Sequence, residues 1–227
     1  MTREFGGTEE HPAFDWFYAS TYVRTRETAA HLGLPGAGWL LNRGLRERDR
    51  GDFGSMDQGS IDEAYPVNAA IKKLDPLYWR PPGGESIAQV AEDRVKSVLA
   101  TLHREADGQR VIAVNHGEMM QAFQLQLERW DDKEFARRDE AKAEKIKNCQ
   151  VLHYSRLDPE TGDQARRFAW VRSAWPVLGD SGAWSIEQAP WAAISRQKLT
   201  NAELLSGIED VPQLFMASAS TEHPRAQ

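Results

Sequence analysis

The chain has 227 residues, which suits one domain or one domain with a tail. Its net charge is −6 and its pI about 5.6, which excludes the basic footprint of a nucleic-acid-binding protein. The single cysteine, Cys149, excludes an intramolecular disulfide and a cysteine-based metal cluster. No apolar run is long enough to cross a bilayer, so we expect a cytoplasmic protein with no nucleic-acid or membrane partner.

The first predicted elements are a strand and a helix. The aromatic content of Phe14–Ala19 favours a strand, and Tyr22–Leu32 predict a helix that stops at Gly33 and Pro35. Arg24 lies in the first turn of this helix, where the helix dipole disfavours a cation. We therefore expect Arg24 to face an anion, whereas Arg26 is interpreted as a solvated surface residue.

A second short strand is predicted at Trp39–Leu41. The loop 44–54 that follows is dense in charge and closed by glycines, and it places Glu47 among Arg46, Arg48 and Arg50. Such charge runs are usually solvated, so the residues of this loop alone do not indicate a site.

Residues 56–81 lack sustained periodicity and resemble a long insertion with short helices at Ile61–Ala64 and Val67–Lys73. Long loops in compact domains tend to be lids or binding loops. Residues 78–80 (Tyr, Trp and Arg) are candidates for substrate contact, although ordinary loop packing is the favoured interpretation.

The clearest helix begins at Ser86 and runs to about Glu105. Its apolar residues recur at helical spacing and predict one buried stripe: Ile87, Val90, Ala91, Val95, Val98, Leu99 and Leu102.

The central feature of the sequence is the segment 110–120. The apolar run Val111–Val114 predicts a buried strand, and Glu118–Leu127 predict a helix. His116 therefore lies at the carboxyl end of a strand and just before a helix, where open α/β sheets bind ligands and where free N–H groups suit phosphate. Strand, helix and strand in this order predict parallel pairing.

The last third is predicted to be less compact. Residues 131–147 predict an exposed charged helix, and Cys149–Tyr154 with Arg167–Arg172 predict an antiparallel hairpin. The chain from Trp175 onward is predicted to be irregular, with Trp184 and Trp191 as candidate anchors. Residues 217–227 are predicted to be disordered.

Four segments in order resemble the histidine phosphatase superfamily, also called phosphoglycerate-mutase-like, over roughly residues 13–155. Ser20 with Arg24 is similar to the end of that family's second strand and its following helix. The loop around Glu47 is similar to the acid-bearing segment. Gly84-Glu85-Ser86 is similar to the start of the long helix, and Asn115-His116-Gly117 to the second catalytic histidine.

The resemblance implies a role for each of three residues. Arg24 would bind the phosphoryl group of the substrate, and His116 would contact the same oxygens and stabilise charge in the transition state. Glu47 would protonate the leaving oxygen and then activate water or an acceptor hydroxyl. The family reaction passes through a phosphohistidine and needs neither metal nor cofactor.

One family motif does not occur. The resemblance implies an Arg-His-Gly triplet on a first strand before Ser20, and its histidine is the nucleophile. The chain has no such triplet, and His11 is interpreted as a surface residue. Three explanations stay open: the chain is truncated at its N-terminus, it is a non-catalytic pseudo-phosphatase that binds a phosphorylated ligand or protein, or another segment or chain completes the site.

The expected fold is therefore α/β, a three-layer αβα sandwich with a mostly parallel sheet that lacks its first strand. Residues 1–195 would form the domain, incomplete at its N-terminus, and 196–227 a C-terminal extension. The expected partner is a small phosphorylated substrate or inorganic phosphate, with a homo-oligomer left open, and phosphatase activity is favoured over mutase activity.

Overall fold

A computed structural model describes residues 8–141, 144–195 and 198–209. The chain divides into two compact units, Met1–Ser195 and Arg196–Gln227. In the second unit the described helix is α8 (Asn201–Glu209). The segment 217–227, predicted to be disordered, lies outside the described residues. The assignment of residues 1–195 to a histidine-phosphatase-like domain and of 196–227 to an extension stays a prediction.

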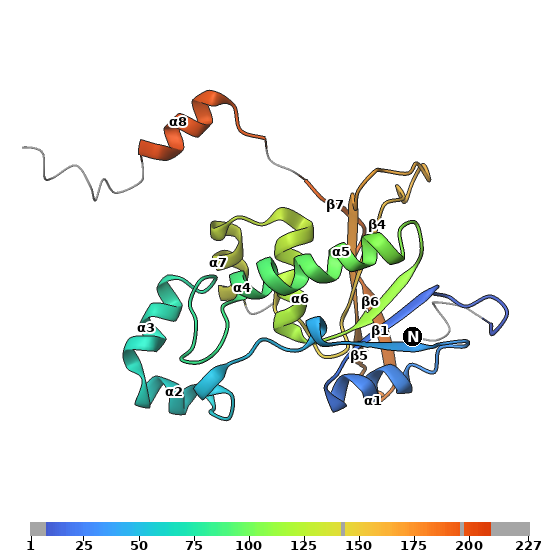
Figure 1. Ribbon diagram of the computed structural model, residues 1–227, viewed down its shortest axis with the longest axis horizontal. Helices are drawn as coiled ribbons and strands as arrows, with labels where there is room; N and C mark the ends of the chain where they lie inside the picture. Colours follow the sequence, from blue (N-terminus) through green and yellow to red (C-terminus); the bar gives the residue numbers. More distant parts are fainter. Residues whose placement is uncertain (1–7, 142–143, 196–197, 210–227) are drawn as a thin grey trace, which may run out of the picture. The chain divides into compact units, whose positions relative to one another are not determined.

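Three parallel strands form the sheet that carries the candidate site. They are β1 (Trp16–Ser20), β2 (Trp39–Asn42) and β3 (Val111–Val114), in the order β2-β1-β3 (Figure 1). Strand β1 is central, because Ser20 aligns with Asn42 on one side and Ala19 with Val114 on the other. The predicted parallel arrangement is confirmed, and all three strands end at the same edge of the sheet.

Helix α1 (Val23–His31) follows β1, close to the predicted range. A 3₁₀ turn at Arg43–Leu45 follows β2, and a second one lies at Gly51–Phe53. The predicted insertion holds two helices, α2 (Gln58–Ala64) and α3 (Pro66–Leu74). Two insertion side chains, Ile61 and Trp79, form a small buried cluster with Phe53 of the preceding loop.

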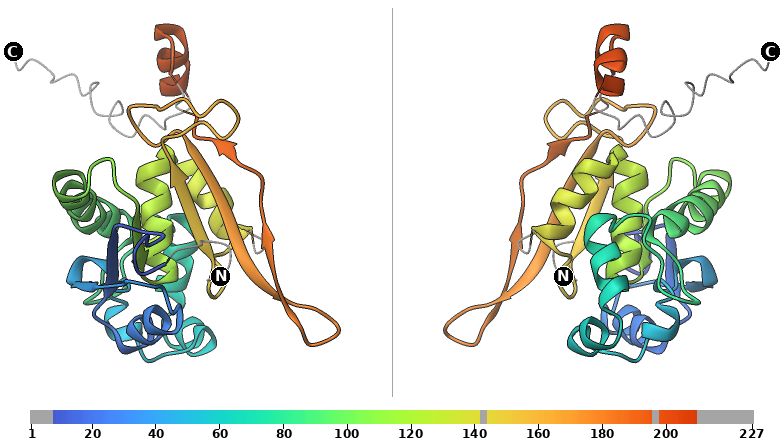
Figure 2. Two further views of the ribbon diagram at one scale, coloured as in Figure 1. Left: turned by 90° about the vertical axis from the view of Figure 1, so that its right-hand side faces the viewer. Right: turned by 90° about the vertical axis from the view of Figure 1, so that its left-hand side faces the viewer.

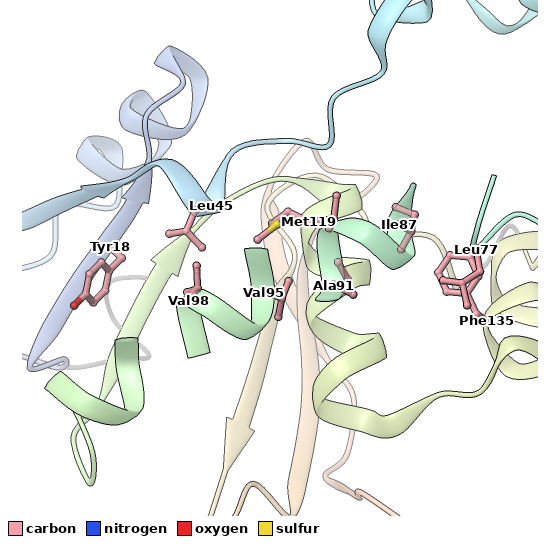
Figure 3. Close-up of a cluster of buried hydrophobic side chains, with 11 residues drawn as sticks. Tyr18, Leu45, Leu77, Ile87, Ala91, Val95, Val98, Met119 and Phe135 are labelled. Carbon is pink, nitrogen blue, oxygen red and sulfur yellow. The ribbon is translucent and has the colours of Figure 1, made fainter. Parts of the chain in front are cut away.

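The long helix before β3 is α-helical at α4 (Ile87–Gln89), π-helical at Val90–Val95 and α-helical again at α5 (Lys96–Glu105). Ser86 caps it, since its Oγ accepts from the Gln89 N–H while the Gln89 side chain accepts from the Ser86 N–H. The predicted apolar stripe forms the centre of the core. Figure 3 shows most of this core: Tyr18, Leu45, Leu77, Ile87, Val90, Ala91, Val95, Val98, Met119, Ala122 and Phe135.

After β3 the chain continues as α6 (Gly117–Gln124), a π-helical turn (Leu125–Arg129) and α7 (Asp132–Glu140). Helix α7 is shorter than the charged helix predicted for 131–147. Within the described residues, no helix is long and apolar enough to span a membrane.

A second, antiparallel sheet follows, with β4 (Val151–Ser155), β5 (Trp170–Leu178), β6 (Trp184–Gln188) and the short β7 (Ala192–Ala193). Figure 2 shows it in yellow and orange, apart from the blue strands β1 and β2 of the parallel sheet. The predicted hairpin is confirmed as the pairing of β4 with β5. The expectation of one mostly parallel sheet was too simple, because the described strands form two sheets.

The prediction of irregular chain after Trp175 was wrong. Strand β5 continues to Leu178, and Pro176 lies inside it, opposite Ile186 of β6. Backbone hydrogen bonds join Ser173 to Ala189 and Gly179 to Ala183, so position 176 falls on a non-hydrogen-bonded pair. Beyond Ala174 no described strand flanks β5 on its other side, so proline costs no ladder bond there.

Candidate functional site

The three side chains singled out from the sequence meet at the carboxyl edge of the parallel sheet. Arg24 lies in the first turn of α1, just after β1, and His116 directly precedes α6, just after β3. Glu47 follows the 3₁₀ turn that ends β2. Parallel strands bring these separated residues together because all three connections leave the sheet at one edge.

His116 is buried, with 5% of its surface exposed, and both of its ring nitrogens are engaged. Its Nδ1 accepts a hydrogen bond of 3.1 Å from Nε of Arg24, and its Nε2 lies 2.9 Å from Oγ of Ser20. The ring of Tyr22 packs edge-on against the imidazole at 5.2 Å. Because a guanidinium can only donate, the neutral ring must carry its proton on Nε2 and donate it to Ser20.

The surroundings of His116 keep the ring neutral. Burial, followed by the positive charges of Arg24 and Arg94, lowers the pKa of His116 from 6.5 to about 4. The neutral imidazole has one N–H, which it now gives to Ser20, so a bound oxyanion would have to replace or share Ser20 as the acceptor.

Glu47 is held at the N-terminus of α6. Its Oε1 accepts from the backbone N–H of Met119 at 3.3 Å and from that of Arg48 at 3.1 Å. Burial and the nearby Glu118 carboxylate nevertheless raise the pKa of Glu47, although these hydrogen bonds and the charge of Arg24 act in the opposite direction. A raised pKa favours the protonated carboxyl, the form that can give a proton to a leaving oxygen.

Two arginines, Arg48 and Arg94, fix the position of the loop that carries Glu47. Arg48 belongs to the charged run for which a solvated surface was the usual expectation. Arg48 is 5% exposed and makes two hydrogen bonds to the Glu118 carboxylate, at 2.8 and 3.2 Å. Arg94 donates to the backbone oxygens of Arg46 and Glu47 and pairs with Glu85 at 2.7 Å. The interpretation of Arg48 as solvated was wrong, because its partner comes from a helix 70 residues further along the chain.

Gly51 and Gly84 allow the acid-bearing loop (residues 44–54) to contact the turn before the long helix. Gly51 has φ +50°, and a Cβ there would collide with backbone atoms of Pro82 and Gly84. The contact is closed by backbone hydrogen bonds from Asp52 to Pro82 and from Glu85 to Asp49. The Glu85 carboxylate also accepts from the Asp49 N–H at 2.9 Å.

Of the other predicted contacts, Trp79 is buried with Phe53 and Ile61, and Tyr78 and Arg80 lie in a separate depression. Tyr78 and Arg80 line an open depression of about 450 Å³ together with Ser86, Ala88, Gln89, Glu92 and Asp93, and none of Arg24, Glu47 or His116 lines it. His11 is exposed, as predicted. Among the described residues, no group of three or more His, Cys, Asp or Glu side chains could hold a metal ion.

The model of the histidine phosphatase superfamily (branch 1) matches residues 3–156. A 2,3-bisphosphoglycerate-dependent phosphoglycerate mutase from Methylobacterium radiotolerans is 33% identical over 123 residues, which are 51% of this chain and 57% of the mutase. A 6-phosphofructo-2-kinase/fructose-2,6-bisphosphatase from Gallus gallus is 32% identical over 106 residues, 47% of this chain and 21% of that enzyme. The match thus covers 57% of the length of the mutase and 21% of the length of the bifunctional enzyme.

One solved structure supports the fold, and a second is similar over part of the chain. A structure titled mycobacterial hydrolase 2 has a TM-score of 0.50 at 20% identity and covers 87% of this chain and 78% of its own. A mycobacterial glucosyl-3-phosphoglycerate phosphatase in complex with inorganic phosphate has a TM-score of 0.49 at 22% identity, covering 76% and 75%. Because the family model covers well over half of the chain, the chain belongs to branch 1 of the histidine phosphatase superfamily.

Proposed function

We propose that this chain binds the phosphoryl group of a small phosphate monoester between Arg24 and His116, with Glu47 as the acid and base of a phosphatase or mutase reaction. The observation that carries the proposal is the direct hydrogen bond between Nε of Arg24 and Nδ1 of His116 beside the N-terminus of α6. A bound phosphate would take up the Arg24 donor and meet the positive end of that helix.

The chemistry of phosphoryl transfer needs this arrangement. Positive charge and hydrogen-bond donors must surround the equatorial oxygens, while a proton donor stands beside the leaving oxygen. Arg24 and the Nε2–H of His116 would supply the hydrogen-bond donors. The Glu47 carboxyl, whose raised pKa favours its protonated form, would supply the proton. Glu47 would then take a proton from water or from an acceptor hydroxyl.

The nucleophile is not supplied in the family's form, because no Arg-His-Gly triplet occurs in the 227 residues. Two unpaired strand edges bear on this point. Among the described strands, β3 pairs only with β1 and β4 pairs only with β5 along its length. We infer that a further strand pairs with the open edge of β3 in the catalytically complete protein, and that this chain alone binds phosphate without turnover.

The second candidate function is that of a non-catalytic phosphate-binding protein. It is favoured by the same missing triplet and needs only the Arg24 and His116 contacts. A cytoplasmic location belongs to either proposal and rests on the single cysteine and the absence of an apolar run in the sequence.

The test is titration calorimetry of the purified chain with inorganic phosphate and with vanadate. We expect Arg24→Ala to weaken binding about tenfold or more, the loss of one charge-assisted hydrogen bond. The matched control is Arg26→Ala, an exposed arginine of the same helix, which should leave the affinity unchanged. Equal affinities of the wild type and Arg24→Ala would refute the assigned site.

A further inference from the structure

Three side chains of the antiparallel sheet form a cluster that the candidate site does not use. Arg172 of β5 lies opposite His153 of β4, and its Nε lies 3.4 Å from Nδ1 of that histidine. Cζ of Arg172 is 4.6 Å from the ring centroid of Trp191, which lies just before β7, and the rings of Trp191 and His153 are 4.8 Å apart. Each of the three half-buried side chains therefore contacts the other two.

The hydrogen bond between Arg172 and His153 fixes the orientation of the guanidinium. A guanidinium can only donate, so Nδ1 of His153 accepts from its Nε. Burial, followed by the charge of Arg172, lowers the pKa of His153, and the ring therefore stays neutral near pH 7 and can accept this bond. Trp191 packs against the same guanidinium, which leaves its two Nη groups as the donors that still need acceptors.

Neither Nη group has a partner in the part of the chain that the structure describes. Arg172 forms no ion pair there, and Nε makes its one hydrogen bond. A half-buried guanidinium is less well hydrated than an exposed one, so pairing with an anion becomes more favourable. The two Nη groups lie side by side and match the two oxygens of a carboxylate.

The same pair of residue types occurs at the candidate site, with one difference. There, Nε of Arg24 donates to Nδ1 of His116, and the ring of Tyr22 packs against the imidazole. His116 lies at a helix N-terminus, which favours phosphate, whereas His153 lies in the middle of a strand. The single positive charge of Arg172 therefore suits a carboxylate, which carries one negative charge, better than a phosphate dianion.

The surface beside Arg172 is apolar. Side chains alternate along a strand, so four apolar residues of β5 share the face of Arg172: Trp170, Ala174, Pro176 and Leu178. Leu178 is paired with Trp184 of β6, and these two residues are 54% and 70% exposed. A ligand held by Arg172 would thus meet hydrocarbon next to its charged group.

We propose that Arg172, held between His153 and Trp191, binds a small organic carboxylate whose apolar part lies against the neighbouring side chains of β5. The two Nη groups would bind the carboxylate end-on, and His153 acts as a positioning residue that keeps Nε in place. This site goes beyond the proposed function and does not depend on it, because it shares no residue with the site of Arg24, Glu47 and His116.

The competing interpretation is structural: Arg172 only packs against Trp191 and stabilises the sheet through a cation–π contact. The two interpretations differ in how His153 responds to an added carboxylate. A carboxylate bound to Arg172 offsets the positive charge beside the imidazole and raises the pKa of His153. A purely structural arginine leaves this pKa unchanged.

The experiment is an NMR titration of the full chain, followed through the ring signals of His153 and the indole signal of Trp191. The ligands are straight-chain carboxylates from acetate to hexanoate, with hexanamide as the uncharged control. We expect saturable shifts of both signals, an upward shift in the pKa of His153, and an affinity that rises about two- to fourfold for each added methylene. Hexanamide should produce none of these changes.

Variants test the assignment to Arg172. Arg172→Gln should weaken hexanoate binding about tenfold or more, the loss expected for charge-assisted hydrogen bonds. Arg167→Gln, which changes an exposed arginine shortly before β5, is the matched control and should leave the affinity unchanged. Arg24→Ala should also leave hexanoate binding at His153 unchanged, so this site and the proposed phosphate site can fail separately.

Three results would overturn the inference. They are shifts that do not saturate, equal responses to hexanoate and hexanamide, and an unchanged affinity in Arg172→Gln. If Arg172→Gln does not fold, the comparison of hexanoate with hexanamide on the wild type still decides the question. Phosphate that binds as well as hexanoate at His153 would contradict the preference for a carboxylate.

Discussion

At the scale of single residues, the site depends on charges held in defined states by burial. His116 is kept neutral and Glu47 is shifted toward its protonated form, although the two lie at the same helix N-terminus. Burial is the main cause of both pKa shifts, because it disfavours the charged form of each group; the charges of Arg24 and Arg94 add to it at His116, and the Glu118 carboxylate adds to it at Glu47. Such opposed shifts are typical of sites that move protons.

The neutral state of His116 predicts a pH-dependent stability. The unfolded chain protonates this residue near pH 6.5, whereas the folded protein does so only near pH 4. The contribution of His116 to the free energy of unfolding is therefore fully present above pH 6.5. It is lost, by about 3 kcal/mol, as the pH decreases from 6.5 to about 4. Urea unfolding at several pH values should show this loss in the wild type and not in His116→Gln. His153→Gln, which removes a half-buried histidine of β4, should retain it.

The pair of Arg48 with Glu118 predicts unequal costs for its two halves. The Arg48 side chain is 3% exposed and that of Glu118 is 32% exposed. Glu118→Gln leaves a deeply buried guanidinium without a counter-charge and should cost about 3 kcal/mol. Arg48→Met leaves a carboxylate that water can still reach and should cost about 1 kcal/mol. Chemical denaturation measures both, and equal costs, or the reverse order, would contradict the role of burial.

At the scale of elements, the site is assembled where loops touch rather than inside one helix or strand. The acid-bearing loop contacts the turn before α4 at Gly51 and Gly84. Arg94 of the long helix donates hydrogen bonds to the backbone oxygens of Arg46 and Glu47 in this loop. The position of Glu47 thus depends on packing between segments more than 30 residues apart.

Gly51→Ala should therefore disturb both folding and phosphate binding. The added methyl group collides with the backbone of Pro82 and Gly84, and φ +50° is unfavourable for alanine. We expect a loss of about 1–3 kcal/mol in stability together with weaker phosphate binding. Gly38→Ala is the control, because a Cβ there meets nothing within 4 Å. An unchanged phosphate affinity in Gly51→Ala would show that the contact between this loop and the turn before α4 does not position Glu47.

At the scale of the whole molecule, each of the two sheets in the first unit has an edge strand with an unpaired side among the described strands, β3 in the parallel sheet and β4 in the antiparallel sheet. The sequences of β3 and β4 carry neither proline nor an Asp, Glu, Lys or Arg, the residues with which natural edges usually resist pairing. The central strand β1 is buried from Phe17 to Ser20, whereas all four residues of β3 are only half-buried despite an equally apolar sequence.

We therefore expect the purified chain to self-associate with increasing concentration and to hydrolyse no aryl phosphate. Sedimentation velocity and p-nitrophenyl phosphate assays test the two parts. A monomer that melts cooperatively and turns over p-nitrophenyl phosphate would overturn the inference that a further strand and its histidine are needed.

The sequence by itself determined the local elements and the residue types of the site. The aromatic strand before Ser20, the apolar run before His116 and the stripe of the long helix are local patterns, and each produced the expected element close to its predicted bounds. Local patterns singled out Arg24 and His116, and the family resemblance added Glu47 and gave each residue a role. The fold brings the three side chains to one edge, while their chemical roles stay predictions.

Only the tertiary structure decided which charges are buried and how the strands are shared between sheets. Nothing in the charged run 46–50 tells Arg48, buried against Glu118, from Arg50, which has no ion pair among the described residues. The strand predicted to end at Arg172 continues through Pro176, because the sequence does not show which neighbour flanks each edge of a strand. Both outcomes depend on partners distant in the chain, and burial and pairing are properties of those contacts rather than of the local sequence.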